Sequence, residues 1–183
     1  FPDAIILAIV LPVAFELPKT DRRIIGHFAK LDIHGSFDTA KKLFPGTKRV
    51  YVVAGAHGVD RSVEAQARRD LKNMENRLEF IYLNHMPFEE MLVAISSAPP
   101  DAIVLTLAFS QDVNGRTYTA PIVNQRLSQV SPAPIFGILE HTLGYGITGG
   151  SLINFELVGK KAGLLALDIL GSGSVTEMIS DVL

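Results

Sequence analysis

Short apolar runs alternate with amphipathic segments from Lys48 onward, and this alternation constrains the fold more than any other feature. Four runs are rich in β-branched, aromatic or other apolar residues: RVYVVAG (49–55), LEFIYL (78–83), DAIVLTLAF (101–109) and PIFGIL (134–139). The run 101–109 is nearly all apolar, as in a strand that is covered on both faces. Strand–helix alternation with short connections predicts an α/β fold, with a parallel, doubly wound sheet and helices on both of its faces.

The segments between these runs carry apolar residues at helical spacing. Asp60 is expected to cap a helix whose inner face holds Val63, Ala67, Leu71 and Met74. Pro87 suits a helix's first turn, before Phe88, Met91, Leu92 and Ile95. A helix over 121–130 is expected to turn Ile122, Val123 and Leu127 inward. Two further helices are predicted, one stopped by Pro45-Gly46 and one over FELVGKKAGLLALDILG with Val158, Ala162, Leu165 and Ile169 on one side and Gly171 at its end.

The stretch HTLGYGITGGSLINF (141–155) contains Gly144-x-Gly146-x-x-Gly149, the glycine pattern of a dinucleotide-binding turn. That turn requires a strand running straight into the glycines and a helix starting directly after them. Here the strand ends near Leu139, and SLINF looks extended, which delays the helix to about Glu156. We therefore interpret the glycines as a bend that lets the backbone cross between structural units.

Composition narrows the function classes. The 183 residues are 48% hydrophobic, which suits one globular unit with a sizeable core, built in one or two lobes. A formal charge of −2 gives no basic footprint for nucleic acid, and the absence of cysteine excludes disulfides and thiol catalysis. The most apolar stretch, 4–15, is shorter than the roughly 20 residues of a membrane helix and contains Pro12. We interpret it as a buried strand and expect any signal or anchor to lie outside this sequence.

No catalytic constellation is found in the sequence. None of the five histidines forms a metalloprotease pair at i, i+4 spacing, and no Gly-x-Ser-x-Gly elbow occurs. We therefore expect no enzymatic activity, no cofactor and no metal.

Ligands of open parallel sheets bind beyond the carboxyl ends of the strands. This rule selects four loops: 54–60, 84–86, 109–112 and 140–145. In the first, Gly55 and His57 lead into a helix whose N–H groups would hold a carboxylate or phosphate, or else they form a plain turn.

Four further candidates lie in the later loops. Asp112-Val113-Asn114-Gly115 looks like a calcium-loop fragment but lacks the third oxygen ligand and the terminal Glu, so we interpret it as a turn in which Asp112 is a candidate to face a cleft. Glu140 is a candidate partner for a ligand amine, or a solvated acid. Phe109 and Tyr145 would stack on a ligand or close the core; we favour the core for Phe109.

Four blocks of the chain resemble the ABC-transporter substrate-binding protein family with the type I periplasmic-binding fold, especially its version in the extracytoplasmic sensor region of bacterial sensor histidine kinases. They are LPVAF, FDTAKKLFPGTKRVYVVAG, PDAIVLTLAFSQDVNGRTY and GYGITGGSLINFELVGKKAGLLALDILGSG. The last block is the most specific, and the resemblance extends from Leu11 to the C-terminus. It implies two α/β lobes joined by crossing segments, with a small solute in the interlobe cleft.

On that template, residues 1–30 are a remnant of the first lobe and a crossing, 31–140 form the second lobe, and 141–183 cross back and supply a helix of the first lobe. PDAII and LPVAF are nearly joined, with no room for the helix that separates the matching strands in the family. We infer either a cropped chain or residues missing between Ile6 and Leu11. A first lobe reduced in this way is expected to expose apolar surface or to have it covered by a partner.

The resemblance implies a non-enzymatic, extracytoplasmic solute sensor whose membrane-anchored kinase lies elsewhere in the same polypeptide, with a homodimer as one possible assembly. The main alternative is the free solute-binding component of an ABC importer. A doubly wound enzyme acting on nucleotides or sugar phosphates is a further alternative, as is a region that mediates dimer contacts and binds no solute. A nearly neutral cleft with one or two acids suits an amino acid or a small amide.

Overall fold

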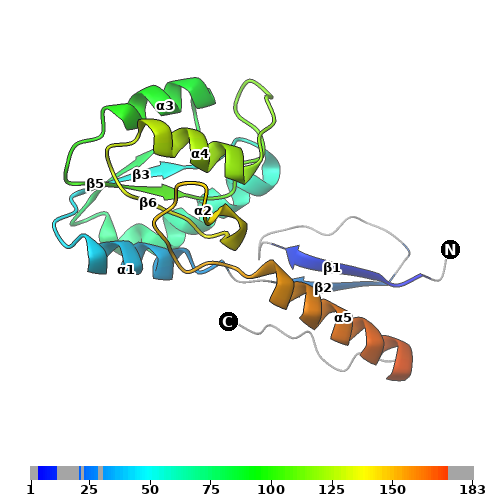
Figure 1. Cartoon of the computed structure of the whole chain (residues 1–183). Coiled ribbons are helices and arrows are strands. Elements are labelled where there is room, and N and C mark those ends of the chain that lie inside the picture. The colour runs from blue at the N-terminus through cyan, green and yellow to red at the C-terminus, as the bar shows by residue number, and fades with distance from the viewer. Residues whose placement is uncertain (1–3, 12–20, 22, 29–30, 173–183) are drawn as a thin grey trace. The chain divides into compact units, whose positions relative to one another are not determined.

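The chain divides into two compact units, described here from a computed structural model (Figure 1). The structure describes residues 4–11, 21, 23–28 and 31–172. The larger unit is Asp32–Ile153, and the smaller one combines Phe1–Leu31 with Asn154–Leu183. The chain therefore passes between the units twice, once at Leu31 and once at Ile153.

A four-stranded parallel sheet organises the larger unit. Its strands are β3 (Arg49–Val53), β4 (Glu79–Tyr82), β5 (Ala102–Thr106) and β6 (Ile135–Phe136), in the order β4-β3-β5-β6. All three strand pairings are parallel. From β3 the chain first adds a strand on one side and then two on the other, so the strand order reverses between β3 and β5. The predicted parallel, doubly wound sheet is confirmed.

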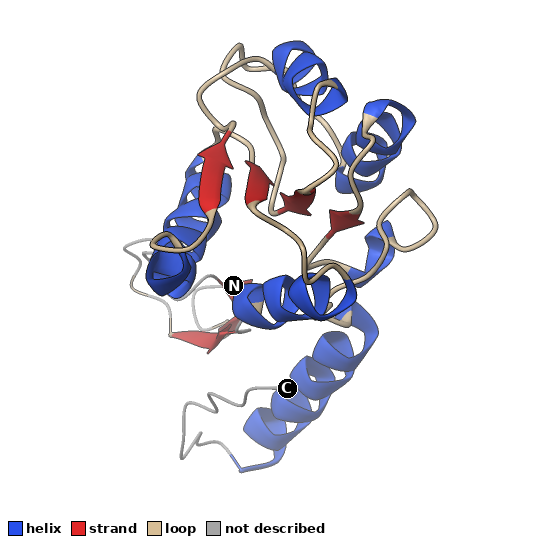
Figure 2. Ribbon diagram, turned by 90° about the vertical axis from the view of Figure 1, so that its left-hand side faces the viewer, coloured by secondary structure: helices blue, strands red, loops and turns tan. Residues whose placement is uncertain are grey.

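Helices cover both faces of this sheet, as the end-on view of its strands shows (Figure 2). One face carries α1 (Ile33–Leu43) and α2 (Gly58–Leu71), which contact each other. The other carries α3 (Phe88–Ser96) and α4 (Ala120–Val130), which also pack together. Two 3₁₀ turns, η1 (Lys72–Met74) and η2 (Glu140–Thr142), follow α2 and β6.

The core follows most of the apolar pattern of the sequence. Met74 was predicted on the inner face of the helix after Asp60, but it lies in η1, where no residue is buried. All five residues of β5 are buried, as are the four predicted inward residues of α3. In α4, Val123 and Leu127 are buried, but Ile122 is 48% exposed, so its predicted inward position is wrong. Successive helical residues are turned by about 100°, and the inner face of α4 is centred on Val123, Asn124 and Leu127 instead.

The start of α2 also differs from the prediction. The helix begins at Gly58 with His57 as its N-cap residue, so Asp60 lies in the first turn rather than at the cap. Its carboxylate still accepts the N–H of His57, over 3.3 Å. An acid at the third helical position that bonds back to the cap residue is one half of a capping box.

The smaller unit pairs β1 (Ile6–Leu11) with β2 (Ile24–Phe28) in parallel, and α5 (Phe155–Ser172) contacts β1. Along α5, Val158, Ala162 and Ile169 are buried, whereas three leucines, Leu164, Leu167 and Leu170, are 60%, 67% and 82% exposed. The expected exposure of apolar surface in this part of the chain is confirmed. The stretch 4–15, predicted as a buried strand, forms the strand β1, but Ile5 and Ile6 are 41% and 36% exposed, so its start is not buried. Residues 12–15 lie outside the described residues.

Tyr82 in the edge strand β4 leads to a first prediction. Its buried hydroxyl has no hydrogen-bond partner within the described part of the chain, and Arg68 lies 3.5 Å above its ring. Burial raises the pKa of Tyr82 to about 12, although the nearby Arg68 lowers it. Because an unpaired buried hydroxyl is unfavourable, Tyr82→Phe is expected to leave the free energy of unfolding within about 0.5 kcal/mol of wild type or to raise it.

The pH dependence supplies the second half of this test. A tyrosine ordinarily ionises near pH 10, so the raised pKa makes wild type lose stability as the pH climbs from about 10 toward 12. Tyr82→Phe should lack that loss, as urea unfolding at about pH 7 and about pH 11 would show. Tyr82→Leu, which also removes the ring stacked on Phe80, is the control and should be less stable. A marked loss in Tyr82→Phe at about pH 7 would contradict this interpretation.

Candidate functional site

Four loops meet at the carboxyl-terminal edge of the sheet in the larger unit, because parallel strands all end at the same edge. They follow β3, β4, β5 and β6, and they are the loops that the sequence selected. The loops after β3 and β5 are hydrogen-bonded together: the Gly55 N–H donates to the Ala108 carbonyl over 3.0 Å, and the Ala56 N–H donates to the Gln111 carbonyl over 2.7 Å. This junction lies where the strand order reverses.

Asp60 connects the two loops of this junction. It is buried, with only 2% of its surface exposed. The Oδ2 atom accepts the N–H and the hydroxyl of Ser110 over 3.0 and 2.8 Å. The same oxygen accepts the N–H groups of His57 and Gln111, each over 3.3 Å. One carboxylate oxygen therefore takes four donors from the two loops, and it fixes one loop against the other.

These contacts help to decide between the two alternatives predicted for Gly55 and His57, an anion site and a plain turn. The N–H groups of both residues already bond to acceptors of the protein, Ala108 and Asp60. A Cβ atom at Gly55 would collide with the Asp60 carboxyl group and approach the Gln111 carbonyl. The geometry thus favours the turn over the anion site, and it explains why position 55 is a glycine. The His57 residue is exposed.

Asp112 is likewise engaged by the protein. It is 3% exposed; Oδ1 accepts the N–H groups of Asn114 and Arg116 over 2.9 and 3.0 Å, and Oδ2 is 3.4 Å from the Phe88 N–H and the Tyr118 hydroxyl. Burial alone would raise the pKa of Asp112, but these hydrogen bonds outweigh burial and hold the pKa below its ordinary value. Asp112 organises the loop before α4 and the start of α3. The predicted turn at this position is present, with an Asp112–Gly115 backbone bond.

Phe109 lies in the core, as the sequence favoured. It is 5% exposed, and its ring packs edge-on against Phe88 and Tyr118, with centroids 5.2 and 5.7 Å away. Phe88 and Tyr118 complete the cluster at 4.8 Å. These three rings support the loop after β5 from beneath.

Glu140 and Tyr145, in the loop after β6, are open to solvent, as His57 is. Glu140 starts η2 and is half-buried, and its N–H donates to the Ile153 carbonyl over 3.2 Å. Tyr145 is 44% exposed. Because neither candidate is fully buried, both are accessible to a solute at this edge.

The glycine-rich segment after η2 forms a bend, as predicted, and not a dinucleotide-binding turn. Gly144 and Gly146 have positive φ angles of 82° and 101°, which only glycine adopts readily. Residues 149 and 153 then form parallel bridges with Phe136 and Leu139, so the segment lies along β6, and α5 begins only at Phe155. No helix N-terminus follows the glycines directly.

The edge thus brings together Gly55, His57, Phe109 and Asp112 in two joined loops, with Glu140 and Tyr145 in the loop after the neighbouring strand β6. Sequence reasoning missed the part played by Asp60, Ser110 and Gln111. The available signal was an acid three residues after the N-cap of α2, which was interpreted as a cap alone.

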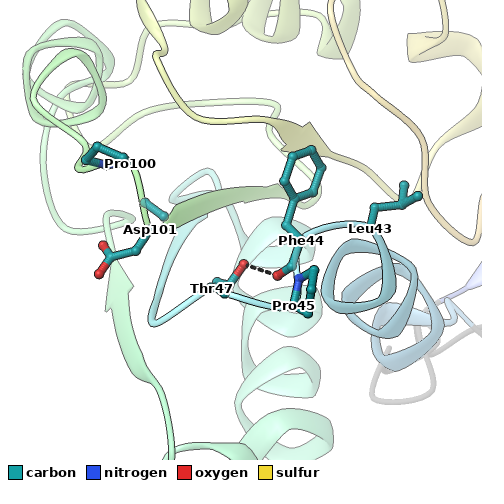
Figure 3. Close-up of a pocket in the computed structure, with 8 residues that line it drawn as sticks. Leu43, Phe44, Pro45, Thr47, Pro100 and Asp101 are labelled. Carbon is teal, nitrogen blue, oxygen red and sulfur yellow. Dashed lines mark hydrogen bonds between the residues drawn. The ribbon is translucent and has the colours of Figure 1, made fainter.

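A pocket of about 380 Å³ lies at the opposite edge, where β5 begins and α1 ends (Figure 3). Its walls are largely apolar: Leu43, Phe44, Pro45, Gly46, Thr47, Pro100, Asp101 and Ala102. The Asp101 carboxylate is paired with Arg49 over 2.8 Å, and the Thr47 hydroxyl donates to the Phe44 carbonyl. None of the loops predicted to bind a ligand contributes to this pocket.

Two features are absent from the described residues. No group of three or more histidine or acidic side chains there is arranged to hold a metal ion. No helix within those residues has the length and hydropathy that crossing a membrane requires.

Comparison with known proteins supports the fold. The ligand-free, open structure of CD0873, a substrate-binding protein with adhesive properties from Clostridium difficile, is similar to this chain with a TM-score of 0.64 and 20% sequence identity. The match covers 98% of this chain but 61% of CD0873, so the present chain spans about three fifths of that protein. No protein-family model and no curated protein matches the sequence. The chain therefore has the α/β fold of a substrate-binding protein, with parallel sheets in both units.

Proposed function

We propose that this chain is the solute-binding part of an extracytoplasmic sensor, and that it passes the binding signal to a membrane-anchored kinase of the histidine kinase type in the same polypeptide. The solute binds at the carboxyl-terminal edge of the sheet in the larger unit. It acts by population shift, because it binds one form of the two-unit protein better than the other. No chemical step is needed for this role, and we propose none.

The solute-binding part of the proposal rests on the loops found where the strand order reverses. In doubly wound sheets a ligand binds at that point, beyond the carboxyl ends of the strands. Here the loops after β3 and β5 are fixed to each other at this point, and Glu140 and Tyr145 lie at the same edge. The likeness to a substrate-binding protein adds support for this class of function.

The chemistry of the edge favours a small solute that carries an amine or amide. Asp60 and Asp112 are engaged by the protein, which leaves Glu140 as the accessible acid among the predicted site residues. A half-buried carboxylate is a suitable partner for an ammonium or amide group. An amino acid or a small amide meets these requirements, and the placement of such a solute between two lobes stays a prediction.

The alternative is a free solute-binding component of an ABC importer. The similar structure belongs to a protein described as a substrate-binding protein. This likeness supports solute binding in general, and it supports the importer component as much as the sensor. The coding sequence downstream of Leu183 separates the two proposals. A membrane segment followed by a kinase region supports the sensor, and its absence supports the importer component.

The binding proposal is tested by thermal unfolding of the intact protein with amino acids, small amides, small carboxylates and purines. A solute at about 100 times its Kd stabilises the folded state by about 2.7 kcal/mol. One compound class is expected to raise the melting temperature. If no class does so, the proposal of solute binding is contradicted.

For the compound found in this way, Glu140→Gln is expected to weaken binding about tenfold or more, because a charge-assisted hydrogen bond is lost. Isothermal titration calorimetry would measure the change. Glu75→Gln is the matched control, since Glu75 is an exposed acid directly after η1, at the opposite edge of the sheet, and the variant should bind like wild type. Equal affinity of Glu140→Gln and wild type would remove Glu140 from the site.

A further inference from the structure

The position of Asp60 is not explained by helix capping alone, and Asp60 is not an ordinary surface acid. It lies in the first turn of α2, beside the point where the strand order reverses, and it is 2% exposed. Helix N-termini at such points are where anions are usually bound, because N–H groups and the helix dipole converge there. In this protein a carboxylate of the chain itself occupies that position.

We infer that Asp60 is a specificity-determining residue: it acts as an internal anion that keeps carboxylate and phosphate groups of a solute out of the junction between the loops after β3 and β5. The inference rests on the proposed function and deepens it, because it states which solutes the site rejects. Solutes that need an anion pocket at this point are excluded, and neutral or cationic groups are accepted.

Occupied donors are the first reason. Four donors from His57, Ser110 and Gln111 already converge on Oδ2 of Asp60. An incoming anion would have to compete for those donors, and any donor it removed from Asp60 would leave a buried carboxylate short of partners. The second reason is charge, since a like charge within a few ångströms of a buried carboxylate is unfavourable.

The close packing around Gly55 is the third reason. The Asp60 carboxyl group lies against the Cα atom of Gly55, where no Cβ would fit. The carboxylate is therefore confined between the two loops, and it has no space to move aside for a second anion. The site is filled before a solute arrives.

Chemical rescue tests this inference without knowledge of the natural solute. Asp60→Ala removes the carboxylate and leaves a space with unsatisfied donors. Its melting temperature is expected to fall by about 4–8 °C. Sodium acetate, compared with sodium chloride at equal ionic strength, should restore at least half of that loss, because acetate supplies the missing carboxylate. If Asp60→Ala does not fold in chloride, the same comparison is made on the yield of refolding.

Three controls define the outcomes. Wild type should respond equally to acetate and chloride, and so should Asp70→Ala, which removes an exposed acid from the same helix. Asp60→Asn should be destabilised without rescue, because its amide still fills the space. An acetate-dependent shift of the wild-type amide resonances at residues 55–57 and 110–111 would overturn the inference, as would the absence of rescue in Asp60→Ala. Failure of the solute screen, with rescue intact, would instead count against the proposed function alone.

Discussion

Phe88→Ala is expected to lower the free energy of unfolding of the larger unit by about 3–5 kcal/mol. The Phe88 side chain is fully buried at the start of α3, and its ring packs edge-on against Phe109 and Tyr118. Truncation removes these contacts and leaves a cavity under the loop after β5, where Arg126 also lies over the ring. Urea unfolding followed by circular dichroism would measure the loss.

Two comparisons make this result specific. Phe88→Leu keeps most of the volume and is expected to cost less than half as much, since a large apolar side chain remains in place. Val93→Ala changes an exposed residue of the same helix, 68% exposed, and should lie within about 0.5 kcal/mol of wild type. If Phe88→Ala were as stable as Val93→Ala, the aromatic cluster would not support this part of the fold.

Gly150→Ala is expected to destabilise the protein by about 2–4 kcal/mol, through backbone strain and a steric clash together. Gly150 has a φ angle of 150°, and a Cβ there would collide with the Gly137 carbonyl and press on the Ser36 hydroxyl at 3.0 Å. That hydroxyl donates to the Gly137 carbonyl over 2.8 Å and accepts the Ser151 N–H over 2.9 Å. The substitution therefore separates the returning segment from α1.

Gly144→Ala is the control that separates the cost of the steric clash from the cost of the backbone conformation. Gly144 has a φ angle of 82°, but nothing lies within 4 Å of a Cβ built there. It should cost about 1 kcal/mol, the cost of the left-handed conformation alone. Thermal unfolding of both variants measures the difference, and equal losses would show that the packing around Gly150 is not tight.

The sheet and the inward residues of α3 were predictable because their signals are local. A strand covered on both faces must be apolar throughout, as β5 is, and a helix must repeat its apolar residues every three to four positions, as α3 does. The four loops of the site followed from the order of strands and helices alone. Ile122 was misplaced because an apolar residue next to a helix's inner face gives the same signal as one on it.

The contacts that shape the site were not predictable, because they join residues far apart in sequence. Asp60 and Ser110 are 50 positions apart, and Ser36 and Ser151 are 115 apart. Nothing around Asp60 in the sequence distinguishes an acid that caps a helix from one that also binds a second loop. The same limit applied to Asp112, whose partner Phe88 lies 24 positions away.

The central claim is that a small solute binds at the carboxyl-terminal edge of the sheet in the larger unit. Amide hydrogen exchange of the intact protein, with and without the compound found by thermal unfolding, tests it most directly. Slower exchange is expected in the loops 54–60, 84–86, 109–112 and 140–145 beyond the general stabilisation of the core. Protection centred instead on the pocket between Leu43 and Ala102, with those four loops unchanged, would contradict the claim.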